Sequence, residues 1–216
     1  MTEETYRLRE AAEKIGIMPS TLVYIVNVGD VLPERGVPTW KTHEGVEWPD
    51  LKAFVLTADD IERYKIEMDR RKFVDFKVEY ADIYQPADGP NPRGLEFGPG
   101  WTQILREFCD RLRDYNDAGK NCRLRWGKEK FGAMKLFCDY PDDVQRYVEH
   151  ARGVAYGRSL GTCQECSAPG RLRFGDMICL TLCNRHAHLA APLDEEKDGK
   201  ILDVSAWTRS QRRPPK

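Results

Sequence analysis

The chain of 216 residues lacks the features of an exported or membrane-spanning protein. It has no run of about 18 apolar residues, the length that a transmembrane helix needs. It has no basic leader followed by an apolar segment. Its seven cysteines are an odd number, which argues against a framework of disulfides. We therefore expect a cytoplasmic protein without a membrane partner.

The signatures of several enzyme classes are also missing. The sequence has no phosphate-binding G-x-x-x-x-G-K-[ST], no G-x-S-x-G nucleophile elbow and no H-E-x-x-H metalloprotease motif. We therefore expect no catalytic residues and no enzymatic activity.

Net charge is small, with 34 Lys and Arg against 35 Asp and Glu. The charges are unevenly distributed along the chain. Residues 1–98 hold 13 cations and 19 carboxylates, whereas residues 99–216 hold 21 and 16. An acidic first half and a basic second half predict two units with different surfaces.

Two pairs of metal-ligand residues stand close together near the end of the chain. Cys163 and Cys166 form a C-x-x-C, and Cys183 and His186 form a C-x-x-H. Zinc prefers four thiolate or imidazole ligands in a tetrahedron, and a C-x-x-C lets one tight turn supply two of them. Because four protein ligands leave no position for a water, the motif predicts structural Zn²⁺.

Cys179 and His188 are further ligand candidates beside this motif. The four residues above are preferred because they come as two pairs, whereas Cys179 lies in an expected strand and has the character of a buried apolar residue. Either one could still substitute as a ligand.

The segment between the two pairs predicts a β-hairpin over 171–182 with its turn at Gly175 and Asp176. A helix over 184–191, ended by Pro192, is expected to follow it. A C-x-x-C turn (the knuckle), then a hairpin, then a ligand-bearing helix is the order that predicts a treble-clef or zinc-ribbon-like finger. A finger-type nuclease is a less favoured alternative, because it needs further metal ligands on the hairpin, where only Asp176 is present.

The first 30 residues predict two short helices. Apolar residues recur with helical spacing over 6–15, Gly16 is expected to end that helix, and a second helix is expected from Pro19 to Gly29 with Ser20 as its N-cap. Two helices joined by a short turn with a glycine are typical of a helix-turn-helix.

A hairpin wing is expected over 37–48, and a third helix is expected to begin after Thr57. Thr57 and Asp60 have the spacing of a capping box, and Leu56 and Ile61 that of a hydrophobic staple.

The series REAAEKIGI, PSTL and FVLTADDIERY resembles MerR-like and excisionase-like winged helix-turn-helix domains over about residues 5–68. The resemblance implies that the second helix reads DNA. Over 21–28, however, this helix carries no cation, and only Thr21, Tyr24 and Asn27 could form hydrogen bonds. Because an acidic domain is repelled by phosphate, the alternative is that the helix binds a protein through Tyr24, Asn27 and Val28.

Residues 62–84 predict a helix to about Arg71 and then a strand over 72–80. Three prolines and two glycines over 85–94 predict a linker. The expected organisation is α+β, and its parts are a winged helix-turn-helix-like domain (1–84), a Pro/Gly linker (85–98), a small α-β-β-α domain with a zinc finger (99–193) and a polar, basic tail (194–216).

The second half predicts a helix over 98–118, two strands over 121–140 and a helix over 144–159. The first helix has an apolar stripe at Trp101, Ile104, Leu105, Phe108, Cys109 and Leu112. The last is expected to bury Val144, Tyr147, Val148, Ala151 and Val154. Cys109, Cys122 and Cys138 lie in apolar contexts and are interpreted as core thiols.

Four separated blocks of this half occur in a characteristic order: Gly100-Trp101, then KEKFGAMKLF over 128–137, then CQECSAPG over 163–170, then TLCNRH over 181–186. They resemble a group of small zinc-finger proteins of bacteriophages, prophages and bacteria that are largely uncharacterised. In this chain Ala133 replaces a second glycine, and Ser167 replaces the glycine after the knuckle. The resemblance implies the four zinc ligands and a phage or prophage origin, hence the host cytoplasm, but no activity.

Cations and aromatic residues alternate on the expected hairpin over 121–140. This arrangement suits phosphate contact and base stacking, and the candidate nucleic-acid-binding residues are Arg123, Arg125, Lys128, Lys130, Lys135, Arg171 and Arg173. The leading hypothesis is a non-enzymatic, zinc-binding regulatory protein associated with nucleic acid. The alternative is a phage-encoded inhibitor or adaptor that binds a host protein complex, such as a defence system.

Overall fold

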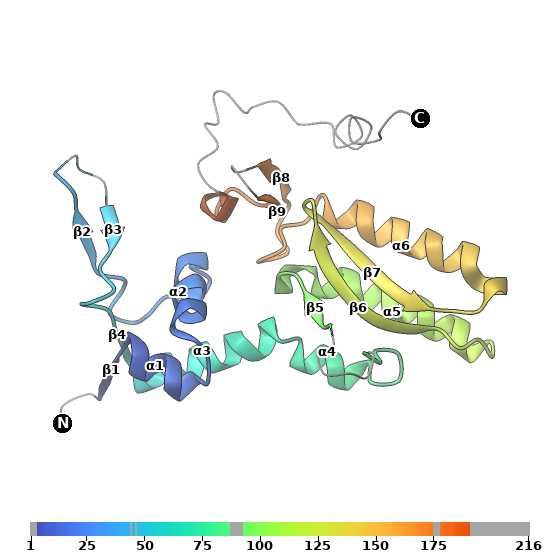
Figure 1. The fold of residues 1–216 in the computed structure, drawn as a ribbon, viewed down its shortest axis with the longest axis horizontal. Coiled ribbons are helices and arrows are strands. Elements are labelled where there is room, and N and C mark those ends of the chain that lie inside the picture. Colours follow the sequence, from blue (N-terminus) through green and yellow to red (C-terminus); the bar gives the residue numbers. More distant parts are fainter. Residues whose placement is uncertain (1–3, 44, 46, 87–92, 175–177, 191–216) are drawn as a thin grey trace, which may run out of the picture. The chain divides into compact units, whose positions relative to one another are not determined.

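The computed structural model describes residues 4–43, 45, 47–86, 93–174 and 178–190. The protein is a mixed α+β chain of two compact units, Met1–Glu79 and Tyr80–Lys216 (Figure 1). No helix in the described ranges has both the length and the apolar character needed to cross a membrane.

The first unit consists of short strands and four helices. They are β1 (Thr5–Arg7), α1 (Leu8–Ile15), α2 (Pro19–Val28), β2 (Thr39–Lys41), β3 (Glu47–Pro49), β4 (Val55–Thr57), α3 (Ala58–Arg71) and α4 (Val74–Glu79). Strands β1 and β4 pair antiparallel, and β2 and β3 form the expected hairpin. The helices α1, α2 and α3 share one apolar core, which includes Ala11, Leu22, Ile25, Leu56, Ile61 and Tyr64.

Helix α1 ends at Gly16 as predicted, but the N-cap of α2 differs from the prediction. Gly16 ends α1 with φ 78°, in the left-handed region that glycine tolerates. Met18, not Ser20, is the N-cap of α2, and Pro19 occupies the first helical position. The prediction of Ser20 was wrong because a proline already has the helical φ and has no N–H group to be capped.

Helix α3 begins at the predicted capping box. The Thr57 hydroxyl oxygen accepts the backbone N–H of Asp60 at 3.1 Å, and the Asp60 carboxylate accepts the backbone N–H of Thr57 at 2.9 Å. Leu56 and Ile61 are both buried in the core of this unit, so the prediction for this helix start is confirmed.

The strand expected over 72–80 is instead helix α4. Phe73, Phe76 and Tyr80 are buried, whereas Val74 and Val78 are exposed. The buried positions therefore recur at helical spacing of three and four residues. The alternation of apolar and charged residues was misleading because the two valines belong to the exposed side.

The second unit is built around a three-stranded sheet. Its elements are β5 (Leu95–Glu96), η1 (Pro99–Trp101), α5 (Thr102–Asp117), β6 (Arg123–Lys130), β7 (Ala133–Asp139), η2 (Asp142–Val144), α6 (Gln145–Ser159), β8 (Arg171–Phe174), β9 (Cys179–Leu182) and η3 (Ala187–Ala190). The strand order is β5-β6-β7, with β5 parallel and β7 antiparallel to β6. Helices α5 and α6 lie together on one face of this sheet (Figure 1).

The apolar stripe of α5 is buried as predicted, and so are Leu124, Met134 and Leu136 of the sheet. On α6 the prediction was partly wrong, since Tyr147 is 56% and Val154 48% exposed. The inward side of α6 instead consists of Val148, Ala151, Ala155 and Ser159. These residues keep the helical period, whereas the size of Tyr147 and Val154 had suggested burial.

The ends of the second unit add two findings. Its first residues pair with the sheet, because Leu124 exchanges backbone hydrogen bonds with Ile83 and Gln85. Part of the expected linker forms β5, and residues 87–92 lie outside the described ranges.

The helix predicted over 184–191 is only the single turn η3. Its backbone bonds span three residues, as from Leu189 to the carbonyl of His186 at 3.1 Å. The tight ligand turn at Cys183 to His186 leaves no room for a regular α-helix to begin at Asn184. The expected hairpin turn at Gly175 and Asp176, the helix end at Pro192 and the tail 194–216 fall outside the described residues.

Candidate metal centre and basic sheet face

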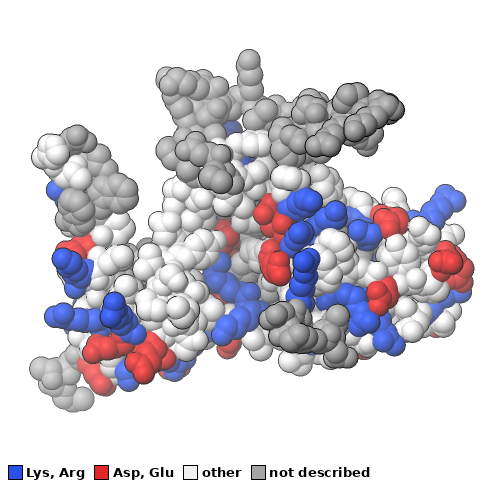
Figure 2. All heavy atoms as spheres, viewed as in Figure 1, with Lys and Arg blue, Asp and Glu red and all other residues white. Residues whose placement is uncertain are grey.

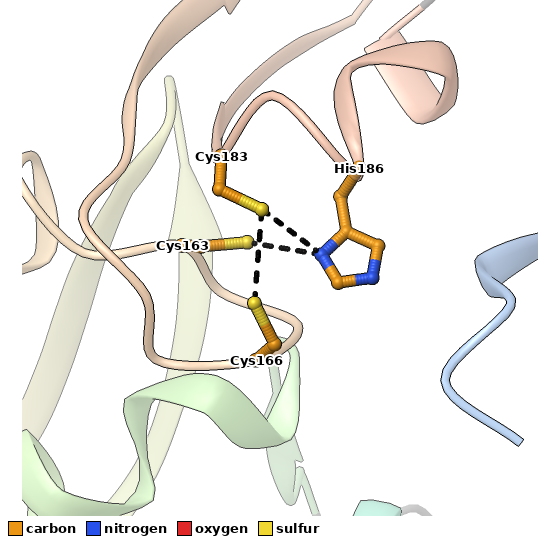
Figure 3. Close-up of side chains that lie close together, drawn as sticks. All are labelled: Cys163, Cys166, Cys183 and His186. Atoms are coloured by element: carbon orange, nitrogen blue, oxygen red, sulfur yellow. Dashed lines mark hydrogen bonds between the residues drawn. The ribbon is translucent and has the colours of Figure 1, made fainter.

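The four predicted metal ligands converge on one point (Figure 3). The sulfur atoms of Cys163, Cys166 and Cys183 and a ring nitrogen of His186 all lie within 4.8 Å of one another. The Cys166 and Cys183 sulfurs are 3.7 Å apart, and the Nδ1 of His186 is 3.4 Å from the sulfurs of both Cys163 and Cys183. This is a Cys₃His cluster that could hold a metal ion.

The backbone around Cys163 and Cys166 forms a closed loop that aims both sulfurs inward. The N–H of Cys163 donates to the carbonyl of Ala168 at 2.8 Å, and the N–H of Ser167 donates to the carbonyl of Cys163 at 3.0 Å. Ser167 has φ 64°, the left-handed conformation that a glycine would adopt at less cost. Its hydroxyl donates to the carbonyl of Gly100 at 2.7 Å, a bond that a glycine could not form.

Burial in the cluster disfavours the negatively charged thiolate of Cys163 unless a positive charge lies beside it. Burial raises the pKa of Cys163 to about 12, although backbone N–H groups of Cys183, Cys166 and Glu165 act in the opposite direction. His186 is fully buried as well. Cys166 and Cys183 are half-buried. A metal cation would supply the positive charge that the buried Cys163 thiolate needs, so this donor set fits a metal ion.

The metal-ligand loop packs tightly against η1. A Cβ added to Gly100 would lie 2.3 Å from the carbonyl oxygen of Cys163, and one added to Gly98 would lie 2.4 Å from that of Gln164. The N–H of Gly100 also donates to Gln164 at 2.6 Å, and the Trp101 indole donates to the carbonyl of Thr162 at 2.7 Å. The Gly-Pro-Gly-Trp sequence before α5 is therefore the surface on which the ligand loop rests.

A second contact lies between the β6–β7 hairpin and the segment that starts at Cys163 and includes β8, β9 and η3. We call this segment the metal-binding part. Gly132, with φ 75°, lies so close to β8 that an added Cβ would be 2.0 Å from Cδ1 of Leu172. The hydroxyl of Thr181 donates to the carbonyl of Gly132 at 2.6 Å. The carboxylate of Glu129 accepts the N–H of Gly132 at 2.5 Å, and burial raises the pKa of Glu129. The Lys-Glu-Lys-Phe-Gly block thus forms a tight turn that packs on the metal-binding hairpin.

These two packing contacts were not predicted from the sequence. The signal for them was present as glycines at 98, 100 and 132, because a glycine often marks a place where backbone approaches closely. The four sequence blocks that contain Gly100, Gly132 and the two ligand pairs therefore meet in one place.

The two spare ligand candidates lie outside the cluster. Cys179 is half-buried on β9, and burial together with Glu129 raises its pKa to about 11. His188 is exposed, and its Nδ1 lies 3.1 Å from the carbonyl oxygen of Arg185. Of the expected core thiols, Cys109 and Cys122 are buried and Cys138 is half-buried, and all three are free.

Five of the seven candidate nucleic-acid-binding residues lie on the β6–β7 hairpin. Lys128 and Lys135 are opposite each other in the register, Trp126 is opposite Phe137, and Arg123 is opposite Asp139. These positions alternate with Leu124, Met134 and Leu136, which are buried. We use the name basic sheet face for the side of β6 and β7 away from the helices, with Arg123, Arg125, Trp126, Lys128, Lys130, Lys135 and Phe137.

Two arginines that the sequence had grouped together have different surroundings. Arg171 is exposed at the start of β8. Arg173 is 1% exposed, and its guanidinium donates to the carbonyl of Leu182 at 3.2 Å and to the side-chain oxygen of Asn184 at 2.6 Å. Arg173 therefore holds the ligand turn in place, and we leave it out of the nucleic-acid-binding surface.

The candidate protein-binding residues of α2 also differ in exposure. Tyr24 and Asn27 are exposed, and the Tyr24 ring lies 5.6 Å from the guanidinium carbon of Arg71. Val28 is 1% exposed. Its side chain belongs to the interior, so only the first two residues could contact a partner without a rearrangement of the helix.

Comparisons of the chain with protein-family models, with curated proteins and with solved structures find no match.

Proposed function

We propose that the Cys₃His cluster binds one structural zinc ion in a treble-clef or zinc-ribbon-like finger. Zn–S bonds of about 2.3 Å and Zn–N bonds of about 2.0 Å give tetrahedron edges of roughly 3.8 Å between sulfurs and 3.5 Å between sulfur and nitrogen. The measured separations of 3.7 and 3.4 Å are close to these edges. A site closed by four protein ligands stabilises a fold and has no position for a reacting water.

On this zinc-stabilised unit we place a non-enzymatic regulatory function that depends on binding to nucleic acid. The observation that carries the proposal is the gathering of cations on the basic sheet face. Figure 2 shows Lys and Arg side chains, with fewer acidic ones among them, over the region of β6 and β7. A phage or prophage origin, and with it a location in the host cytoplasm, stays a prediction that rests on the sequence resemblance.

The charge balance of the basic sheet face supports phosphate binding. Its five cations are joined by Arg93, whose guanidinium carbon lies 4.5 Å from the centroid of the Trp126 ring. Two carboxylates lie beside them. Glu96 is opposite Lys128, and Asp139 forms an ion pair with Arg125 at 2.6 Å. The excess of cations over a short hairpin is the electrostatic footprint that phosphate contacts need.

The first unit suggests the alternative function. Its order of helices and hairpin supports the winged helix-turn-helix interpretation, but the exposed part of α2 offers Met18, Tyr24 and Asn27 rather than cations. An exposed aromatic residue and a methionine on an acidic unit suit a protein partner better than phosphate. An inhibitor or adaptor that binds a host protein complex is therefore the second candidate.

The test is a charge reversal on the basic sheet face with a matched control. Lys128→Glu with Lys135→Glu removes two opposed cations of the face. Arg111→Glu with Arg146→Glu makes the same change in net charge at exposed positions of α5 and α6. Binding of the full-length, zinc-loaded protein to labelled oligonucleotides is measured by fluorescence anisotropy over a series of salt concentrations.

We expect the pair on β6 and β7 to flatten the dependence of log K on log salt by about 0.7 to 0.9 for each cation removed. The pair on the helices should leave the slope nearly unchanged. Equal effects of the two pairs, or no binding by the unmodified protein, would contradict the proposal. In the second case, loss of a host partner on Tyr24→Ala would favour the adaptor function.

A further inference from the structure

Trp126 and Phe137 form a stacked ring pair in the middle of the basic sheet face. The two residues are opposite each other in the β6–β7 register, their ring centroids are 3.5 Å apart, and their planes differ by 6°. Both side chains are half-buried. The pair lies on the side of the sheet away from α5 and α6, so it is not part of the core beneath the helices.

Cations lie over both rings of the pair, and Nζ of Lys128 is 5.7 Å from the Trp126 centroid. The guanidinium carbon of Arg93 is 4.5 Å from the Trp126 centroid, and Nζ of Lys135 is 5.6 Å from the Phe137 centroid. Arg93 precedes β5, which flanks β6, whereas Phe137 is on the edge strand β7. Across the sheet the order is therefore Arg93, Trp126 and Phe137, and Lys135 lies two residues from Phe137 on the same strand.

We propose that this ring pair is a base-stacking site for single-stranded nucleic acid, an inference that rests on the proposed function. An unpaired base takes the place of Arg93 on the outer surface of Trp126. The guanidinium then moves to a neighbouring phosphate, while Lys128 and Lys135 bind the next phosphates of the strand. The substrate class is single-stranded DNA or RNA of mixed sequence, because every base has a face that can stack.

The position of Arg93 supports this exchange. A guanidinium is planar and stacks on an aromatic ring as a base does, so it occupies the space that a base would need. Arg93 is exposed, and an exposed cation–π contact is weaker than the stacking of a base on an aromatic side chain. Displacement of Arg93 by a base is therefore favourable, and the freed charge remains close to the strand.

A duplex cannot use the same site. Its bases are stacked on one another, and their faces are not accessible to a protein side chain unless the duplex is opened. Its phosphates can still reach Lys128 and Lys135. The ring pair should therefore contribute to the binding of single strands and not to the binding of duplexes, whereas the lysines contribute to both.

The experiment compares aromatic and aliphatic variants of both rings in the full-length, zinc-loaded protein. Trp126→Leu removes the ring on which the base would stack, Phe137→Leu removes the ring that holds Trp126 in place from the other side, and Trp126→Phe and Phe137→Tyr keep a stacked pair. A fluorescein-labelled mixed-sequence single strand and its duplex are the probes, and anisotropy gives both affinities at several salt concentrations. Zinc content and circular dichroism show which variants are folded. If one leucine variant loses its zinc or its helical circular dichroism signal, the affinities of the other leucine variant are used to test the stacking site.

We expect each leucine variant to bind the single strand about tenfold or more weakly, with an unchanged salt slope and an unchanged affinity for the duplex. The tyrosine and phenylalanine variants should bind as the unmodified protein does. If the leucine variants bind single strands normally, the stacking site is overturned while the proposed function stands. If the unmodified protein binds neither probe, the proposed function itself fails.

Discussion

The hydroxyl of Thr181 donates a hydrogen bond of 2.6 Å to the carbonyl oxygen of Gly132. Both residues are buried. Thr181 lies two residues before Cys183 of the candidate metal cluster, and Gly132 lies at the tip of the hairpin that carries Lys128 and Lys135. The metal-binding part and the hairpin that carries the basic sheet face are thus joined by direct packing within one unit.

The first prediction concerns the close approach at Gly132. Gly132→Ala should destabilise the protein by about 2 to 5 kcal/mol, because the alanine suffers from the positive φ and its Cβ overlaps Leu172. The control is Gly119→Ala, which has a similar φ of 79° but no atom within 4 Å of the added Cβ. It should cost only about 1 to 2 kcal/mol.

Urea unfolding of the zinc-loaded variants gives these free energies. Leu172→Ala in the Gly132→Ala background should recover part of the loss, because it removes the overlapping methyl group. Equal losses of unfolding free energy for Gly119→Ala and Gly132→Ala would show that backbone strain alone causes the loss and that the packing against β8 does not contribute to stability.

The second prediction concerns the support of the ligand loop. In Gly100→Ala the new Cβ would lie 2.3 Å from the carbonyl oxygen of Cys163 and 2.7 Å from the backbone nitrogen of Cys166. Because backbone atoms of two ligands must shift, we expect a loss of about 10- to 100-fold in zinc affinity, as for other groups that position metal ligands. Competition with a chromophoric chelator measures this affinity.

Gly157→Ala is the matched control for Gly100→Ala. Gly157 is on α6, and an added Cβ would meet no atom within 4 Å. This substitution should stabilise the helix by about 0.5 to 1 kcal/mol and leave zinc affinity unchanged. Normal zinc affinity in Gly100→Ala would disprove the supporting role of η1.

Local signals were sufficient to predict the metal cluster and the start of α3. A C-x-x-C and a C-x-x-H specify ligands through spacing alone, and a capping box needs only Thr57 and Asp60 three residues apart. These interactions are formed within a few residues or within one short hairpin, so the rest of the fold has little influence on them. That is why both could be predicted without a structure.

Features that depend on distant packing could not be predicted. The segment 72–80 alternates as a strand would, but the burial of Phe73, Phe76 and Tyr80 makes it helix α4. Arg173 differs from Arg171 only through the residues that surround it in the folded chain. Composition reports that a residue is charged or apolar, whereas its function here depends on which side of a strand or helix it occupies.

The third prediction tests the ligands against the two spare candidates. Cys163→Ser and Cys183→Ser should lose the stoichiometric zinc and unfold the metal-binding part, since its buried cluster among the described residues is small and consists of Cys163, Leu180, Leu182 and Ala190. Cys179→Ser and His188→Ala should keep a full zinc content. Elemental analysis of the purified variants measures the zinc, and loss of zinc in Cys179→Ser or His188→Ala would contradict the assignment.

The fourth prediction separates a structural arginine from a surface one. Arg173→Ala leaves the carbonyl of Leu182 and the side chain of Asn184 without this donor, and it removes a fully buried side chain. We expect a loss of several kcal/mol in stability, about 1 to 3 kcal/mol of it for the buried carbonyl of Leu182 and the rest for the lost packing of the arginine stem, since Asn184 is exposed and can bond to water. Arg171→Ala, at an exposed position of the same strand, should change stability by less than about 0.5 kcal/mol.

Thermal unfolding at constant zinc concentration distinguishes these two variants. Arg173→Lys should fall between wild type and Arg173→Ala, because an ammonium cannot reproduce the fork of a guanidinium. A neutral effect of Arg173→Ala would mean that its two hydrogen bonds do not stabilise the ligand turn.

The last prediction follows from thiol pKa values. Burial raises the pKa of Cys138 to about 12 and that of Cys109 well above the ordinary thiol value. Because the thiolate is the reactive form, these residues should remain unlabelled by iodoacetamide near pH 8, where a free thiol of pKa about 8.5 reacts readily. In the zinc-loaded protein the three ligand cysteines should be protected as well, by coordination.

Removal of zinc by a chelator should change this labelling pattern in one part of the chain only. Cys163, Cys166 and Cys183 should become labelled, because the metal-binding part unfolds without the metal and the burial that raises the pKa of Cys163 is lost with it. Cys109 and Cys138 should stay protected, since α5, β6, β7 and α6 bury their own apolar residues. Labelling of Cys109 or Cys138 at the same rate as the ligands would show that the whole second unit unfolds with the loss of zinc, and mass spectrometry of the labelled peptides separates the two outcomes.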